Sequence, residues 1–253
     1  MGDLGNGQEA RPRPGRRPPR VVAFDTETDR LLNASRSNFK DLRVTVAVAV
    51  DAEGAYHTFF GEKERGLDGL GRLFDDADAI VAYNGRGFDL RVLRNHCADV
   101  DVDRWAAKLV DPFEAMRSAT GSWVKLDELL EANGLPRKSG DGVSAVEWWA
   151  AGERARVAEY CKDDVEGLAA LLALGRFAFP IKGWAAAANP SPANTGAAAA
   201  AEAVAAETSL SPDSNGRTKK ARVVLGWAEL DWDAYVDVAV ASRDDRRSRL
   251  RRL

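Results

Sequence analysis

The first part of the chain alternates short apolar runs with polar turns. Three such runs, rich in Val, Ala and aromatic residues, are separated by polar or glycine-containing segments. Runs of this length and composition are typical of β-strands. The sequence therefore predicts an antiparallel meander of strands at 21–28, 44–50 and 56–60.

Beyond residue 60 the spacing of apolar positions changes to that of helices. Leu67, Leu70, Leu73 and Phe74 mark one face of a helix over 64–75. Strands then alternate with helices, which is the pattern of an α/β fold. The expected fold is a mixed five-stranded β-sheet flanked by helices. The remaining predicted elements are strands at 79–83 and 105–110, helices at 88–97, 112–119, 125–133 and 153–177, and a glycine-rich loop at 137–143.

Composition changes at both ends of the chain. Residues 1–19 contain RPRPGRRPP and are predicted to be a disordered tail, and 180–220 are rich in Ala, Pro and Ser, as in a low-complexity linker. Residues 221–253 again contain Trp and Val. We expect them to form a docking helix around Trp232 with a basic end, RRSRLRRL, that is solvated, contacts phosphate or acts as a nuclear address. The main folded domain is then 20–179.

Charge and cysteine content narrow the class of protein only slightly. The net charge of -3 shows no general basic field for nucleic acid, although a site made of carboxylates would look acidic even with a polyanionic substrate. Cys97 and Cys161 lack the paired spacing of a zinc site, and two cysteines are too few to stabilise a chain of this size by disulfide bonds. With no apolar leader and no run of membrane-spanning length, we expect an intracellular protein, cytoplasmic or nuclear, without membrane contact.

Asp25 and Glu27 stand two residues apart at the end of the first predicted strand. Side chains alternate along a strand, so both carboxylates project to the same side. Like charges held this close repel unless one is protonated or a cation lies between them. The pair is therefore either a divalent metal site or the solvated end of a strand.

Two later motifs carry further acids. Asp89 ends the segment NGRGFD and lies in the first turn of a predicted helix, where a carboxylate also serves as a cap. Tyr160 and Asp164 are four residues apart and share a helix face. At about 100° per residue, Asp164 lies nearer the apolar side of that helix than Asp163, which we expect to be solvated. Each motif alone is also compatible with an ordinary solvated surface.

Taken in order, Asp25-Thr26-Glu27, Asn84 to Asp89 and Tyr160 to Asp164 resemble the three motifs of the DEDD superfamily of 3′-to-5′ exonucleases, which have the ribonuclease H-like fold. The tyrosine matches the DEDDy subclass, because His57 and His96 are the histidines and neither lies near the third motif. With KSGDG followed by EYCKDDV, the chain is similar to predicted exonucleases related to family B DNA polymerases. The resemblance covers residues 20–179.

The resemblance implies a set of site residues. Asp25, Glu27, Asp89 and Asp164 would hold two Mg²⁺ or Mn²⁺ ions, which prefer oxygen ligands. Tyr160 would orient the attacking water, since a free phenol titrates near ~10 and is a poor base.

Further residues have a functional and a structural interpretation. Thr26 and Asn84 would hold the terminal nucleotide or a metal-bound water, and Lys138 would contact a phosphate; the alternative for each is a structural role. Trp148 and Trp149 either stack on bases or pack in the core.

The implied function is a metal-dependent 3′-to-5′ exonuclease acting on single-stranded or frayed 3′ ends of DNA or RNA. Its expected partners, besides nucleic acid, are a polymerase, a helicase or another replication or repair protein on a separate chain. The alternative is an inactive nucleic-acid-binding or scaffold module with the same fold. The presence of all four acids and of Tyr160 argues against an inactive site.

Overall fold

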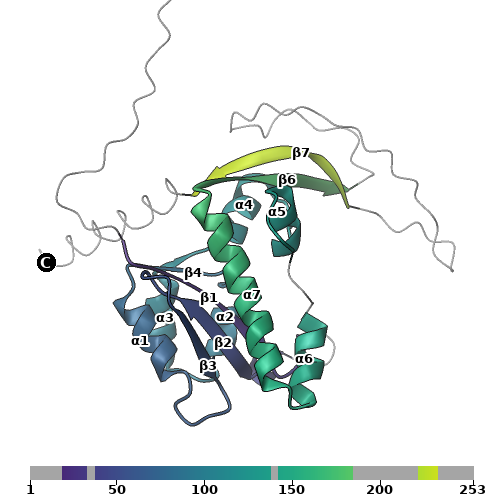
Figure 1. The fold of residues 1–253 in the computed structure, drawn as a ribbon. Helices are drawn as coiled ribbons and strands as arrows, with labels where there is room; N and C mark the ends of the chain where they lie inside the picture. The colour runs from purple at the N-terminus through teal and green to yellow at the C-terminus, as the bar shows by residue number, and fades with distance from the viewer. Residues whose placement is uncertain (1–18, 33–37, 138–141, 185–221, 233–253) are drawn as a thin grey trace, which may run out of the picture.

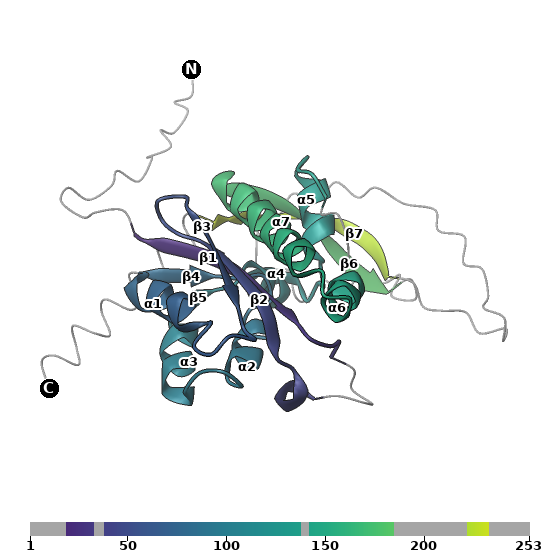
Figure 2. The ribbon, with the colours of Figure 1, turned by 60° about the horizontal axis from the view of Figure 1, so that its bottom comes forward.

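A mixed five-stranded sheet forms the centre of the computed structural model, which describes residues 19–32, 38–137, 142–184 and 222–232. The strand order is β3-β2-β1-β4-β5, with β1 in the middle. Figure 1 labels β1 to β4, and Figure 2 also labels β5. This confirms the predicted α/β fold and the three-strand meander. The strands are β1 (Val21–Thr28), β2 (Val44–Val50), β3 (Tyr56–Phe60), β4 (Ala79–Val81) and β5 (Leu109–Val110).

The pairing of β1 leaves half of one edge open. It runs antiparallel to β2 along nearly its whole length, but parallel to β4 only from Val21 to Ala23, where Ala23 lies opposite Val81. The remainder of β1 extends past the end of β4. Sites in open α/β sheets gather at the carboxyl ends of the strands, and this open edge is such a place.

One face of the sheet packs on a large apolar core. Phe24 of β1 contacts Phe74 edge-to-face at 4.6 Å between ring centroids, and Phe74 contacts Trp105 at 5.3 Å. All three rings are buried. The helices that contribute to this core are α1 (Asp68–Asp76), α2 (Asp89–Leu93) and α3 (Asp99–Ala106).

The opposite face is covered by the later helices. The long helix α7 crosses β1 and β2, as Figures 1 and 2 show, and packs through Val157, Cys161 and Val165 on Val46 and Val48 of β2. None of the described helices is long and apolar enough to cross a membrane. The elements on this side are α4 (Pro112–Thr120), α5 (Leu126–Ala132), α6 (Gly142–Ala150) and α7 (Arg154–Ala173).

The structure corrects the predicted strand at 105–110. Trp105 belongs to α3, and β5 consists of Leu109–Val110 alone. Trp105 and Val102 lie three residues apart and both enter the core as one face of a helix. The sequence prediction had treated the end of this helix and the short strand after it as a single strand at 105–110. A 3₁₀ turn at Phe39–Asp41 precedes β2 and had not been predicted.

A second, two-stranded sheet follows α7, where the sequence predicted a longer helix followed by a linker. Gly175, with φ of +67°, ends the helix earlier than the predicted 177, and β6 (Arg176–Trp184) continues beyond the predicted start of the linker at 180. Phe177 and Phe179 are both buried, which is the period of a strand.

The partner of β6 is a strand in the first part of the predicted C-terminal segment, before the predicted docking helix. It is β7 (Arg222–Asp231), antiparallel to β6. Trp232 is buried and its ring lies 6.5 Å from that of Phe177, so this segment does pack on the main domain. The predicted tail, most of the linker and residues 233–253 lie outside the described residues.

Candidate active site

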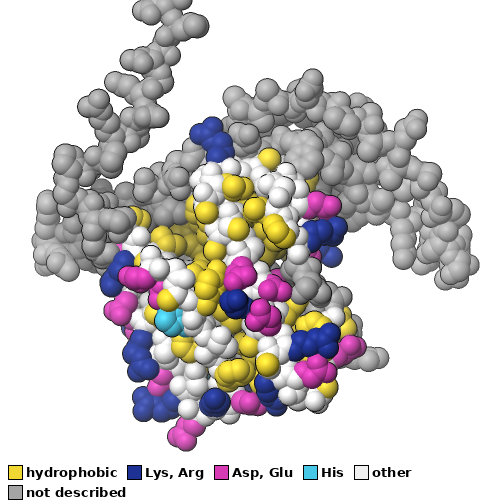
Figure 3. Space-filling view, viewed as in Figure 1, with side chains coloured by type: hydrophobic (Ala, Val, Ile, Leu, Met, Phe, Trp, Pro, Cys, Tyr) yellow, Lys and Arg dark blue, Asp and Glu magenta, His cyan; other side chains and the backbone are white. Residues whose placement is uncertain are grey.

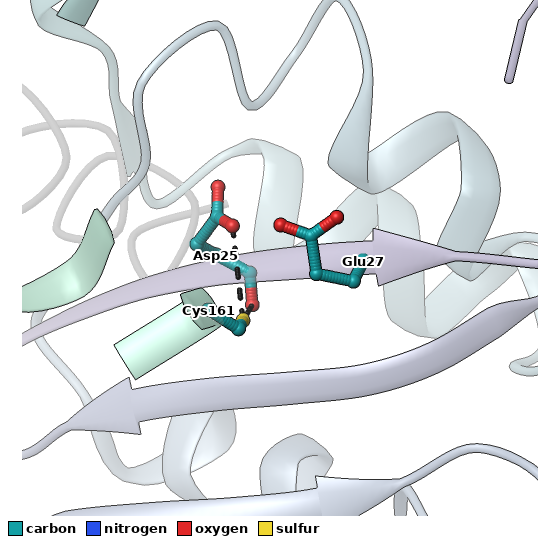
Figure 4. A group of neighbouring side chains, drawn as sticks. All are labelled: Asp25, Glu27 and Cys161. Atoms are coloured by element: carbon teal, nitrogen blue, oxygen red, sulfur yellow. Dashed lines mark hydrogen bonds between the residues drawn. The ribbon is translucent and has the colours of Figure 1, made fainter. Parts of the chain in front are cut away.

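Asp25 and Glu27 lie on the same side of β1, as predicted. Figure 4 shows both carboxylates projecting from this strand, with the sulfur of Cys161 beside Asp25. One ligand atom from each of the three residues lies within 4.8 Å of the others. Glu27 is only 9 % exposed and Asp25 is half-buried, so the pair is not simply the solvated end of a strand.

Cys161 of α7 is a hydrogen-bond donor to Asp25. Its thiol donates to the backbone oxygen of Asp25 at 3.4 Å and to Oδ2 at 3.7 Å. Burial, together with the negative charges of Asp25, Glu27 and Asp164, raises the pKa of the Cys161 thiol well above its usual value. The sulfur therefore stays protonated and orients Asp25. From the sequence, Cys161 was assigned only to the apolar side of the helix. Its position between Tyr160 and Asp164 was the one sequence feature that indicated a place in the site.

The ligand chemistry of this cluster fits a hard divalent cation. Carboxylate oxygens of Asp25 and Glu27 are ligands that Mg²⁺ and Mn²⁺ accept, and a neutral thiol is a poor ligand for either. Zinc sites more often include thiolate or imidazole ligands. The cluster therefore offers ligands for a divalent cation.

Asp164 and Tyr160 also belong to this region. Both are buried, at 6 % and 3 % exposed, on the side of α7 that faces the sheet. Asp164 follows Cys161 by three residues on α7, so the two share a helix face, and its charge adds to those of Asp25 and Glu27 in raising the pKa of the Cys161 thiol. The predicted helix face of Asp164 is confirmed, whereas Asp163 is half-buried where a solvated side chain was expected.

Tyr160 is held in a stack of three side chains. The ring of Trp148 lies edge-to-face with that of Tyr160 at 5.8 Å, and the guanidinium of Arg156 lies 4.1 Å above the Trp148 ring. Trp149 is covered in the same way by Arg154, at 3.6 Å. Both tryptophans are half-buried and pack beside α7, which is the structural alternative considered for them.

Asp89 approaches β1 from the other face. It begins α2, and its Oδ1 accepts a 2.6 Å hydrogen bond from the Thr26 hydroxyl. Thr26 alternates with Asp25 and Glu27, so its side chain points away from theirs. Asp89 is 2 % exposed, and burial raises its pKa to about 7 although the hydrogen bond from Thr26 lowers it. The structure therefore joins Asp89 to Thr26 at the open edge of β1 rather than to the ligand group of Asp25 and Glu27.

The loop before Asp89 is anchored by Asp111, which sequence reasoning had missed. Asp111 is 2 % exposed; its Oδ1 accepts hydrogen bonds from the backbone N–H of Asn84 at 2.9 Å and of Phe113 at 3.0 Å. Its Oδ2 accepts a longer one, 3.4 Å, from the N–H of Arg86. Burial raises the pKa of Asp111 to about 6. An Asp before Pro at a helix start is an N-cap signal, but the sequence gives no sign of its second role.

The predicted substrate-binding residues fall into three situations. The Thr26 hydroxyl donates its hydrogen bond to Asp89, which is the structural role considered for it. Asn84 is half-buried and adopts φ of +61°, a left-handed conformation that Asn tolerates better than most residues, so it turns the chain at the end of β4. Lys138 lies outside the described residues.

Charge on the molecular surface is mixed. In the view of Figure 3, basic and acidic side chains are interspersed over the described surface without a continuous basic field. This agrees with the net charge of -3. Long-range attraction of a polyanion is therefore weak on this face, and any nucleic acid must be held by local contacts.

Comparison with known proteins gives a family match. The family model of the RNase_H superfamily matches residues 22–174, the segment from β1 to the end of α7. A search of curated proteins finds no match.

Among solved structures, the family B DNA polymerase from the hyperthermophilic archaeon Pyrobaculum calidifontis is 21% identical over 63% of this chain and 25% of its own, with a TM-score of 0.48. An exonuclease I structure is 17% identical over 62% of this chain and 41% of its own, with a TM-score of 0.42. The chain thus spans well under half the length of either protein.

Proposed function

We propose that this chain, which belongs to the RNase_H superfamily, is a metal-dependent 3′-to-5′ exonuclease that hydrolyses phosphodiester bonds at the 3′ ends of DNA or RNA. The observation that carries the proposal is the cluster at the carboxyl end of β1. There Asp25 and Glu27 offer oxygen ligands within 4.8 Å of one another, with the buried Asp164 beside them. Closely placed acids of this kind are what a divalent metal requires.

Asp25, Glu27 and Asp164 would hold the metal, with Asp89 contributing from the open edge of β1. Mg²⁺ or Mn²⁺, two ions per site, would activate the attacking water and stabilise the departing 3′ oxygen. Other side chains of the protein hold the carboxylates in position. Cys161 fixes the carboxylate of Asp25 through its thiol, and Thr26 fixes that of Asp89 through its hydroxyl.

Tyr160 would orient the attacking water with its hydroxyl, as expected for the DEDDy subclass. Its ring is held against Trp148, which limits the directions the hydroxyl takes. Asn84, the backbone of Thr26, and Lys138 are the proposed contacts to the terminal nucleotide or its phosphate. The proposed partners remain nucleic acid with single-stranded or frayed 3′ ends and a polymerase, helicase or other replication or repair protein.

The test is degradation of 5′-labelled single-stranded DNA and RNA by the purified protein with Mg²⁺, with Mn²⁺ and with EDTA. We expect a ladder that shortens from the 3′ end, needs the metal, and is lost in Asp25→Ala and Asp164→Asn at unchanged folded content. Tyr160→Phe should slow the reaction without weakening metal binding. Full turnover by Asp25→Ala would rule the proposal out.

The second candidate, an inactive binding module, makes a different prediction in the same assay. It predicts a mobility shift of the labelled strand without cleavage in any metal. The raised pKa of Asp89, to about 7, and the concentration of buried acids at one strand end are costly to folding and favour a catalytic site over a scaffold.

A further inference from the structure

We propose that Trp123, together with Arg117, forms a stacking platform for a base of single-stranded nucleic acid, a few nucleotides from the scissile bond. This inference rests on the proposed function and identifies its substrate as a single strand. Trp123 is 45% exposed, unusually so for a tryptophan in the described part of the chain. Four observations support it.

The platform starts on the sheet face that carries the acids. Ala23 of β1 lies opposite Val81 of the parallel strand β4. Asp25 is two residues beyond Ala23 on β1, and the two side chains share a face of the strand by alternation. Tyr83 is two residues beyond Val81, in the turn that follows β4. Tyr83 packs in the apolar cluster of that face, together with Ala23 and Val81.

A row of aromatic rings then leads outward from Tyr83. The ring of Tyr83 contacts that of Phe113 edge-to-face at 5.7 Å, and Phe113 contacts Trp123 edge-to-face at 5.0 Å. Phe113 is 4% exposed, so the row passes from the interior to the surface within three rings. Trp123 is therefore supported from below and presents the rest of its ring to solvent.

The backbone around Trp123 is fixed. The Tyr83 hydroxyl donates a 2.6 Å hydrogen bond to the carbonyl oxygen of Val124. Ser122 and Val124, on either side of Trp123, are 1% and 2% exposed. With both neighbours buried, Trp123 cannot turn inward, and its side chain is preorganised for binding at low entropic cost.

Arg117 supplies positive charge at the ring. Its guanidinium lies over the Trp123 ring, 4.6 Å from the centroid, and no described residue forms an ion pair with it. A base would therefore stack on the part of the ring that stays exposed. An aromatic ring with an adjacent cation is what single-strand-binding proteins use: the base stacks on the ring and the phosphate passes the cation. A duplex has no unstacked base to offer such a ring.

Nucleic acid explains this surface better than a protein partner does. A protein interface would require a wider apolar area. Trp123 instead stands between buried neighbours and a guanidinium that has no ion-pair partner in the described part of the chain. Trp123 is connected through Phe113 and Tyr83 to the sheet face that carries Asp25 and Glu27, and we place the path of the entering strand along this row of rings.

The experiment measures binding separately from hydrolysis in the full chain. Binding of 5′-fluorescein-labelled single-stranded dT12 is followed by anisotropy in EDTA, for wild type, Trp123→Ala, Trp123→Phe and Arg117→Ala. Val100→Ala, which removes a 69% exposed apolar side chain from α3 on the other side of the sheet, is the matched control. Trp123→Ala should raise Kd about 5- to 100-fold, Trp123→Phe and Arg117→Ala less, and the control should leave it unchanged.

Hydrolysis with Mg²⁺ then separates this inference from the proposed function. For dT12, Trp123→Ala should raise KM with little change in kcat, whereas a dinucleotide too short to reach Trp123 should be cleaved equally by both proteins. Unchanged dT12 binding by Trp123→Ala overturns the platform even if the enzyme is active. Weakened binding in a protein without any hydrolysis supports the platform and rejects the exonuclease.

Discussion

The hydroxyl of Thr26 donates a 2.6 Å hydrogen bond to Oδ1 of Asp89, and both side chains are almost completely buried. The two residues come from different elements, β1 and the start of α2. The bond therefore ties the second acidic motif to the first, on the face of β1 opposite Asp25 and Glu27. Thr26, which stands between Asp25 and Glu27 in the sequence, thus connects these two acids with Asp89.

Thr26→Val should reduce exonuclease activity about 10- to 100-fold, because it removes the donor at nearly constant volume and leaves Asp89 without its orienting partner. The measurement is the steady-state rate on labelled single-stranded DNA. Thr26→Ser keeps a hydroxyl at the same position and is expected to retain most of the rate. Equal activity of the valine and serine variants would contradict the orienting role.

Asp89→Asn should stabilise the metal-free protein at high pH. The pKa of Asp89 is raised from 3.8 to about 7 in the folded state, chiefly by burial. Between these values the folded protein keeps a proton that the unfolded chain releases. The contribution of Asp89 to stability is therefore complete below pH 3.8 and is lost as the pH rises through about 7.

Thermal unfolding in EDTA between pH 4.5 and pH 8 tests this pH dependence. At pH 8, Asp89→Asn should raise Tm by several degrees, which corresponds to a gain in unfolding free energy on the order of 1–3 kcal/mol. At pH 4.5 the difference between the two proteins should be much smaller. Burial also raises the pKa of Asp111, to about 6, and the variant retains this residue, so some loss of stability with pH should persist in it. If Asp89→Asn melts below wild type at pH 8, the prediction is wrong, and the charged Asp89 is better stabilised in the folded protein than its burial indicates.

Cys161→Val should weaken metal binding several-fold. The variant keeps the apolar contacts of Cys161 with Val46 and Val48 but removes the thiol that donates to Asp25. The readout is the Mg²⁺ concentration that gives half-maximal activity, with kcat at saturating Mg²⁺ nearly unchanged. Cys161→Ser retains a donor and serves as the comparison. If valine and serine give the same Mg²⁺ dependence, the thiol has no orienting role.

Much of the fold was predictable because its signals are local. The three strands of the meander were predicted with the bounds that the structure shows, since VTVAVAV and its neighbours are apolar runs closed by turns. The inward face of Asp164 also followed from helix periodicity. The two-stranded sheet was not predicted, because β6 and β7 are separated by a long segment and pair only through tertiary contacts.

The acidic residues of the site were predictable from the sequence, but the residues that hold them in position were not. Asp25 and Glu27 share a side of β1 by simple alternation, and this needs no tertiary information. Which residues hold them in place depends on packing between distant elements. Cys161 reaches Asp25 only because α7 crosses β1, and Asp111 reaches the Asn84 loop only because β5 lies beside β4. Such contacts between distant segments cannot be predicted from the composition or the residue spacing of the sequence.

Asp111→Ala should destabilise the protein by about 2–4 kcal/mol. The substitution deprives three backbone N–H groups, of Asn84, Arg86 and Phe113, of their acceptor, and two of these lie in the loop that leads to Asp89. Urea unfolding at pH 7 measures the loss, with Asp76→Ala, an exposed acid at the end of α1, as a control expected to stay within about 0.5 kcal/mol. Because Asp111 also caps α4, which carries Phe113 and Arg117, single-strand binding should weaken in the same variant. A loss of stability no larger than that of the control would show that water replaces the carboxylate, and that the loop holds its shape without Asp111.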